Sequence, residues 1–365
     1  MPLSKSYKVE AHDHFDFEGS DYRTLFEASD ATVFQDPQWL SLLYAKLAPA
    51  CGVRPLVITV RDQRDDSLCL VLPLMRTSYA GLSCVEPADL GTADYNAIVL
   101  RPDCEETLLA DDAISAEVLK LMKPCHLIFF RKMKGDSRVL AHLLGKVIVA
   151  DMISSCHDMP IWAPYEDWRN EVLSKSFRTG LRRKFKKLEQ QGDVVLKVIS
   201  GEQAILTAMS LLQEQRRSRY PEDLFLEQAY YDFYCAVAIE GEETGLAEVT
   251  ALYVGDDIVG IELGFLKDHC YHFILAGMDN DAYGKMSPGL HLIDYILAHR
   301  VECGDTRADF TIGDERYKAS FGAKPTRLRL MARARTPLGA LALKAYMSGG
   351  PIKELVKRVA AIAKR

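Results

Sequence analysis

The strongest constraint on this fold is a run of three apolar, β-rich segments in the second half of the chain. The segments EVTALYVG, DIVGIELGFL and CYHFILAGM are separated only by short polar turns at residues 256–257 and 267–268. Valine, isoleucine and aromatic residues favour strands, and connections this short join neighbouring antiparallel strands. We therefore predict a three-stranded antiparallel meander over about residues 248–278.

Helical segments surround the predicted meander. The basic amphipathic segment SKSFRTGLRRKFKKLEQQG carries its apolar residues on one stripe and is expected to end at Gly192, and apolar spacing near 3.6 predicts helices over about 201–219 and 226–240. After the meander, Ser287 and Pro288 predict a helix start, because serine is a favoured N-cap and proline fits the first turn. The strand RADFTIG and the segment ERYKASFGA follow.

The first part of the chain shows a similar mixture. TVFQDPQWLSLLYAKLA predicts a helix after Pro37, and RPLVITVRD and SLCLVLPLMRT predict a hairpin. The segment ADYNAIVL, a helix over EETLLADDAISAEVLKLM (105–122) and the strand CHLIFFRK are expected next. The turn-rich segment MPIWAPYEDW follows, and 365 residues suffice for two separate cores. We therefore expect domains at 1–160 and 161–335, both of the α/β (α+β) class, and a basic helical tail at 336–365.

Composition and charge narrow the class of protein. Hydrophobic residues make up 48% and charged residues 26%, and the net charge of -6 provides no global cationic field, so no nucleic acid partner is expected. The N-terminal segment has no apolar core of a signal peptide, and no stretch stays apolar for about 20 residues, so we expect a cytoplasmic protein. The nine cysteines form no C-x-x-C pair, and we assign no metal.

A carboxylate lies between two glycines in the middle strand of the predicted meander. Alternation along a strand places Gly260, Glu262 and Gly264 on one face, and the two glycines are expected to leave a shallow trough for a substrate. Partial burial raises the pKa of a glutamate toward the range a general base needs. Glu262 is therefore a candidate base that removes a proton from an amine or hydroxyl, with a glutamate on a solvated face as the alternative.

The segment before the 288 helix is a candidate anion site. Main-chain amides at a helix start favour negative charge. Gly284 and Gly289 would let the backbone approach phosphates, Ser287 would cap the helix, and Lys285 would add a cation. An ordinary capped helix is the alternative interpretation.

These segments together resemble a known family. FILAGMD, SPGLHLIDYIL and DFTIGDERYKASFGA look like the C-terminal half of GNAT acetyltransferases of the BioF2-like and CelD-like (cellulose biosynthesis) branch, which is itself similar to the FemAB peptidyltransferases. The resemblance covers residues 170–325, including SKSFRTGLRRKFKKLEQQG, and extends more loosely to FQDPQWLSLL. It implies two tandem GNAT-like domains, each a mixed, mostly antiparallel sheet flanked by helices.

The resemblance also implies a reaction and residue roles. The donor would be acetyl-CoA or another acyl-CoA, and the acceptor a small molecule or glycan, such as a sugar or polysaccharide precursor. Tyr317 would protonate the departing thiolate, Lys318 would hold a phosphate or the acceptor, and Asp314 would orient either partner. A phenol with a pKa near 10 is a suitable acid for a thiolate.

The sequence leaves other functions open. A FemAB-like peptidyltransferase using aminoacyl-tRNA is one, although the chain has no spare length for the helical arm of those enzymes. A non-catalytic GNAT-fold protein that binds a partner through the basic face of residues 175–187 is another. The basic tail predicts either a packed or solvated helix or attachment to an anionic membrane surface.

Overall fold

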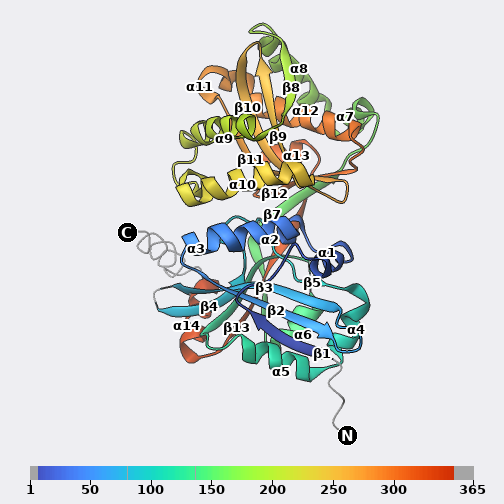
Figure 1. Cartoon of the computed structure of the whole chain (residues 1–365). Helices are drawn as coiled ribbons and strands as arrows, with labels where there is room; N and C mark the ends of the chain where they lie inside the picture. The colour runs from blue at the N-terminus through green and yellow to red at the C-terminus, as the bar shows by residue number, and fades with distance from the viewer. Residues whose placement is uncertain (1–6, 80, 136, 349–365) are drawn as a thin grey trace. The chain divides into compact units, whose positions relative to one another are not determined.

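The structure is a computed structural model that describes residues 7–79, 81–135 and 137–348 (Figure 1). The chain forms two compact units. Among the described residues, unit 1 contains residues from 7 to 153 and from 327 to 348, and unit 2 contains residues 154–326. The chain passes from unit 1 to unit 2 within strand β7 (Ile148–Pro160) and returns within strand β13 (Lys324–Ala334).

Unit 1 is built on a mostly antiparallel sheet with the strand order β1-β2-β3-β4-β6-β13, and β5 pairs with β3. Its strands are β1 (Tyr7–His12), β2 (Arg54–Asp62), β3 (Leu68–Tyr79), β4 (Leu82–Pro87), β5 (Val99–Leu100), β6 (Leu127–Lys134) and the second half of β13. Its helices are α1 (Ser20–Glu27), η1 (Val33–Gln35), α2 (Pro37–Leu42), the π-helix η2 (Leu43–Leu47), α3 (Ala48–Ala50), η3 (Pro102–Cys104), α4 (Glu105–Leu109), α5 (Asp112–Leu121), α6 (Arg138–Leu144) and α14 (Pro337–Met347).

The core of unit 1 follows from its alternating and continuous apolar runs. Ile58 of β2 and Leu72 of β3 are fully buried and share one cluster with Val118 of α5 and Leu140 of α6. Because such burial contributes about 25 cal/mol for each Å² of apolar surface removed from water, these helices are held on the sheet by their apolar faces. On a second cluster, Leu343 fixes α14 against β6.

Unit 2 has the strand order β7-β12-β11-β10-β9-β8. Its strands are the second half of β7, β8 (Val194–Ile199), β9 (Ala247–Val254), β10 (Asp257–Lys267), β11 (Cys270–Met278) and β12 (Arg307–Ile312). Its helices are α7 (Tyr165–Val172), α8 (Lys175–Glu189), α9 (Glu202–Arg217), η4 (Leu224–Leu226), α10 (Gln228–Thr244), α11 (Asn280–Tyr283), η5 (Gly284–Met286), α12 (Pro288–Glu302) and α13 (Arg316–Ser320).

Helices cover both faces of the sheet in unit 2 (Figure 1). A methyl group on Gly277 of β11 would meet Leu212 of α9, whereas one on Gly260 of β10 would meet Leu292 of α12. Gly277 pairs with Ile261, the neighbour of Gly260, and adjacent residues of a strand face opposite sides. Therefore α9 and α12 pack on opposite faces of the β9–β11 meander.

Most predicted elements of unit 2 are confirmed. The meander, the basic helix α8, the two helices α9 and α10, and the helix starting at Pro288 are all present. The predicted class, a mixed and mostly antiparallel sheet flanked by helices, is confirmed. Among the described residues, no helix combines the length and apolar character needed to cross a membrane.

Other elements differ from the predictions. Strands β1, β4, β7, β8 and β13 were not predicted, and the expected single helix near 105–122 is divided into α4 and α5. The units divide inside β7 and β13 rather than at 160 and 335, because the end of β13 pairs with β6 of unit 1. Residues 337–347 of the expected tail form α14, and residues 349–365 lie outside the described residues.

Candidate functional site

Two parallel strands part in the middle of the unit 2 sheet. Strand β12 pairs with β11 only from Cys270 to His272, although β11 continues to Met278. On its other side, β11 remains paired with β10 as far as Met278. The last residues of β11 therefore present one edge that is not covered by β12, and such an edge can bind an extended ligand through main-chain hydrogen bonds.

The backbone of β12 changes direction at Thr311. This residue has a φ of +56°, and the register of β12 against β7 shifts between Asp309 and Ile312. Its amide donates to Asp309 Oδ1 at 2.8 Å, and its hydroxyl donates to the Phe273 carbonyl at 3.0 Å. A β-branched residue with positive φ is rare and marks a local constraint. Here it ends the pairing of the two strands.

Glu262 lies on the α12 face of the sheet beside this opening. It is two residues from Gly260, which contacts α12, and no register shift separates the two positions. Its side chain is 2% exposed, and its Oε1 has no hydrogen-bond partner among the described residues. The Ile274 amide of β11 donates to its carboxylate. A carboxylate in this position is partly satisfied and poorly solvated.

Burial raises the pKa of Glu262 to about 8, an effect that the nearby Arg216 and the Ile274 amide partly oppose. Such a value is suited to proton transfer near neutral pH, because the group exchanges a proton with an amine or hydroxyl without a large energetic penalty. Strongly shifted pKa values of this kind cluster at functional sites. Of the two interpretations of Glu262, the solvated glutamate is wrong.

The prediction of a shallow trough beside Glu262 is also wrong. The position that a Cβ on Gly264 would occupy is 2.0 Å from Tyr271 Cζ, so the Tyr271 ring covers this glycine. Leu292 fills the corresponding space at Gly260. Strand alternation could not reveal this, because the register shifts after Leu263 and directs the Tyr271 ring across the strand. The glycines serve packing here.

Tyr317 of α13 lies in the same region. Burial raises its pKa, and the Glu315 and Glu262 carboxylates raise it further. Its ring packs edge-to-face on Phe310 of β12, with centroids 5.7 Å apart. These contacts place the phenol near the opening between β11 and β12 and keep it protonated over the physiological pH range.

The end of α9 and the turn after it add two cations that the sequence patterns did not indicate. Arg216 donates from Nη1 to the Ala276 carbonyl of β11 at 2.8 Å and pairs with Asp223. The guanidinium groups of Arg216 and Arg219 lie over the Tyr220 ring, 5.0 and 5.2 Å from its centroid. Arg219 is close enough to Tyr317 to lower its pKa. The opening is therefore bordered by a carboxylate, a phenol and two guanidinium groups.

Two further predicted site residues, Lys318 and Asp314, lie near the end of β12. Lys318 is 2% exposed, and its Nζ is 2.8 Å from the Ile312 carbonyl and 3.0 Å from Glu315 Oε2. It stabilises the end of β12 and is not exposed for a phosphate. Asp314 is exposed, with Oδ1 3.7 Å from His157 Nε2.

The start of α12 differs from the predicted cap. Ser287 occupies the N-cap position but has a φ of +57° and makes no side-chain cap hydrogen bond, so the predicted capping role is wrong. Its hydroxyl accepts instead from Lys184 Nζ of α8 at 2.7 Å. Gly289 packs closely on Met278, and Gly284 starts η5 with Lys285 exposed beside it. Lys184 and Lys285 thus both lie near the amide end of α12.

Part of the chain also matches a known protein family model. Residues 175–319 match the family model described as an acetyltransferase (GNAT) domain. The matched segment runs from α8 into α13 and includes Glu262 and Tyr317. This part of the chain is therefore similar to GNAT acetyltransferase domains. A sequence comparison with curated proteins gave no match.

Solved structures resemble the chain over both units. FemX matches with a TM-score of 0.61 and 13% identity over 88% of this chain and 96% of that chain. L-PGS from Bacillus licheniformis has a TM-score of 0.56 and 12% identity, with 94% and 98% covered. A protein of unknown function from Bacteroides thetaiotaomicron has a TM-score of 0.56 and 14% identity, with 90% and 100% covered. These likenesses show the fold.

Proposed function

We propose that the chain is an acyl-CoA-dependent N- or O-acyltransferase. The observation that carries the proposal is Glu262, a buried carboxylate with a pKa near 8, facing the place where β11 and β12 part and Tyr317 lies. The GNAT match of the same segment supports a thioester donor.

The residues fit a phosphopantetheine donor in two respects. The uncovered edge of β11 offers main-chain groups to an extended amide-containing arm, as strand addition does. The amide end of α12, with Lys184 and Lys285 nearby, favours phosphate groups. We still predict that the main chain of this segment contacts the donor's phosphate groups, at Gly284, Ser287 and Gly289.

In the proposed reaction, ionised Glu262 takes a proton from the acceptor amine or hydroxyl, directly or through water. The acceptor then attacks the thioester carbonyl, a C–N or C–O bond forms, and the C–S bond breaks. Tyr317 donates its proton to the departing thiolate and is reprotonated when Glu262 releases its own proton. Acid-base assistance of this kind contributes about 100- to 10,000-fold to rate.

The proposal also names the chemical class of the acceptor. The resemblance to the BioF2-like and CelD-like branch supports a sugar or polysaccharide precursor with an amine or hydroxyl. Asp314 is exposed, with Oδ1 3.7 Å from His157 Nε2, and Glu262 already supplies the base of the proposed reaction. We therefore assign it orientation rather than proton transfer.

A second candidate is transfer of an aminoacyl group. The likeness to FemX and L-PGS, which extends over both units, favours keeping this alternative. Glu262 and Tyr317 would have the same roles, since an ester linkage replaces the thioester and an alkoxide leaves.

Donor binding is the direct test. Acetyl-CoA at about 100 times its Kd should stabilise the folded protein by about 2.7 kcal/mol, visible as a rise in Tm and as heat in calorimetry. Neither signal at several millimolar acetyl-CoA would overturn the acyl-CoA proposal. Aminoacyl-tRNA then becomes the donor to assay.

A further inference from the structure

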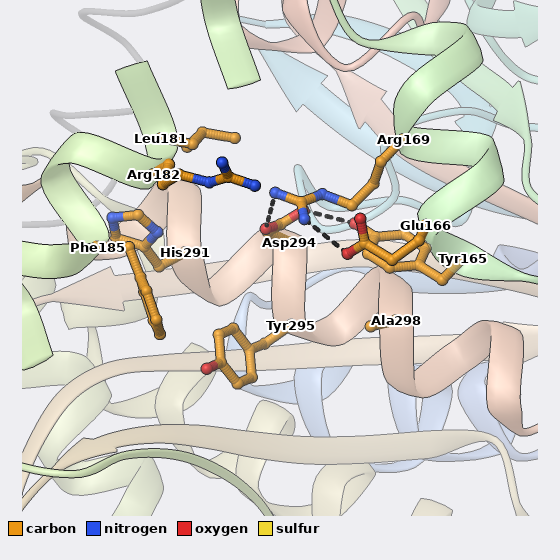
Figure 2. Close-up of a pocket in the computed structure, with 10 residues that line it drawn as sticks. All are labelled: Tyr165, Glu166, Arg169, Leu181, Arg182, Phe185, His291, Asp294, Tyr295 and Ala298. Carbon is orange, nitrogen blue, oxygen red and sulfur yellow. Dashed lines mark hydrogen bonds and ion pairs between the residues drawn. The ribbon is translucent and has the colours of Figure 1, made fainter. Parts of the chain in front are cut away.

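A cavity of about 290 Å³ lies between α7, α8 and α12 (Figure 2). Its lining does not include Glu262, Tyr317 or the start of η5. One side is polar, formed by Tyr165, Arg169 and Asp294, and the other is formed by aromatic side chains of α8 and α12. Small-molecule sites typically combine such an apolar wall with a few fixed polar groups.

The polar side is held rigidly. Tyr165 donates to Asp294 Oδ1 at 2.6 Å, and Arg169 Nη2 lies 3.1 Å from Asp294 Oδ2. Arg169 also bonds to Glu166 at 2.8 Å. The Arg169 guanidinium is therefore fixed in the wall by two carboxylates.

A second guanidinium points at the first. Figure 2 shows Arg182 of α8 extending across the cavity toward Arg169. Among the described residues, Arg182 has no hydrogen bond or ion pair with a carboxylate, and it is exposed at the cavity. Since Glu166 and Asp294 already neutralise Arg169, Arg182 supplies the positive charge at the cavity that would attract an anion.

The charge of helix α8 also favours an anion at the cavity. Helix α8, KSFRTGLRRKFKKLE, contains seven lysine and arginine residues and one glutamate. Arg178, Arg182 and Lys186 are four residues apart and share one face of the helix. Their combined field attracts anions to the cavity entrance, where Arg182 lies.

The aromatic side is formed by three neighbouring rings. Phe185 lies 5.5 Å from His291 and 5.9 Å from Tyr295, measured between ring centroids. His291 Nε2 is 3.1 Å from the Met286 carbonyl, which can only accept, so Nε2 carries the proton. Burial lowers the pKa of His291 to about 4, and the neutral ring then keeps Nδ1 as a hydrogen-bond acceptor.

We infer that this cavity binds a nucleotide, with a phosphate group between Arg182 and Arg169 and the base against Phe185 and Tyr295. A guanidinium is the side chain best matched to phosphate, and aromatic side chains stack on any base. The nucleotide has two sources in the proposed reaction: the adenosine bisphosphate end of the acyl-CoA donor, or a nucleotide-activated acceptor. In this respect the inference rests on the proposed function, whereas nucleotide binding itself does not.

Calorimetry on the full chain tests the inference, with adenosine 3′,5′-bisphosphate and uridine 5′-diphosphate as probes. At least one should bind with a submillimolar Kd, and Arg182→Gln should weaken it by about tenfold or more, as expected for a lost charge-assisted contact. Arg183→Gln is the matched control, because Arg183 is the exposed neighbour on α8 and does not line the cavity. It should change the Kd by less than about twofold.

A third variant separates stacking from charge. Tyr295→Ala should weaken nucleotide binding by about fivefold or more and leave the affinity for inorganic phosphate unchanged. The inference is overturned if neither nucleotide binds at 5 mM, or if Arg182→Gln and Arg183→Gln weaken binding equally, since general attraction to α8 would then explain it.

Competition identifies the source. If CoA displaces adenosine 3′,5′-bisphosphate and binds more weakly to Arg182→Gln, the cavity holds the donor. If only uridine 5′-diphosphate depends on Arg182 while CoA binding does not, the cavity holds an activated acceptor. Either result supports a nucleotide site, and neither depends on the turnover of Glu262 variants, so the inference and the proposed function fail separately.

Discussion

Replacing Glu262 with glutamine should make the protein more stable, and more so as pH rises. Burial keeps this carboxyl protonated in the folded state up to a pKa of about 8, whereas the value for an exposed glutamate is 4.5. The folded state therefore holds a proton that the unfolded chain releases between these two values. Because the folded pKa is the higher one, the stability of the native protein falls as pH rises from 4.5 to 8.

The magnitude follows from the two pKa values. One pH unit corresponds to about 1.36 kcal/mol, so keeping the proton at pH 7 costs at most 1.36 × (7 − 4.5), or roughly 3 kcal/mol. The same cost at pH 5 is below about 1 kcal/mol. Glutamine has the shape of the protonated acid and no proton to lose. Glu262→Gln should thus gain roughly 2.5 kcal/mol more at pH 7 than at pH 5.

Urea unfolding at pH 5, 6, 7 and 8 measures this difference. Glu240→Gln is a suitable control, because Glu240 is an exposed residue of α10 and its replacement should shift the free energy of unfolding by less than about 0.5 kcal/mol at every pH. An equal effect of Glu262→Gln at pH 5 and pH 8 would refute the argument, since the carboxyl would then be ionised and solvated in the folded protein.

Three further outcomes are expected. Glu262→Gln should reduce kcat by about 100-fold or more, as measured by thiol release from acetyl-CoA. In the wild type, kcat should rise with pH to a plateau above about 8. If the variant retained this rise, Glu262 would be excluded as the base. Tyr317→Phe should reduce kcat by about 100-fold with little change in acetyl-CoA affinity, and unchanged kcat would remove it from the mechanism. Gly264→Ala should cost about 1–3 kcal/mol of stability in thermal unfolding, because the added methyl group would meet Tyr271. Gly180→Ala is the control, since this position on α8 faces open space, and it should stabilise the protein by about 0.5 kcal/mol. Equal shifts for the two variants would contradict the packing at Gly264.

The sequence determined the elements whose signals are local. The apolar runs and short turns of the β9–β11 meander are sufficient, because β propensity and turn length act between neighbouring residues. The apolar stripe of α8 and the Pro288 start of α12 are local in the same sense. Glu262 could be selected because an acidic residue in an apolar strand is an exception that requires an explanation.

Only the tertiary structure decided what surrounds that carboxylate. The parting of β11 and β12 depends on the positive φ of Thr311, and the covering of Gly264 depends on a register shift, neither of which has a periodic signal. Strand β13 was missed because its partner β6 is about 200 residues earlier in the chain. Likewise, the cavity beside Arg182 exists because α7, α8 and α12 meet there. Contacts between distant segments depend on packing, and a local pattern of residues does not specify them.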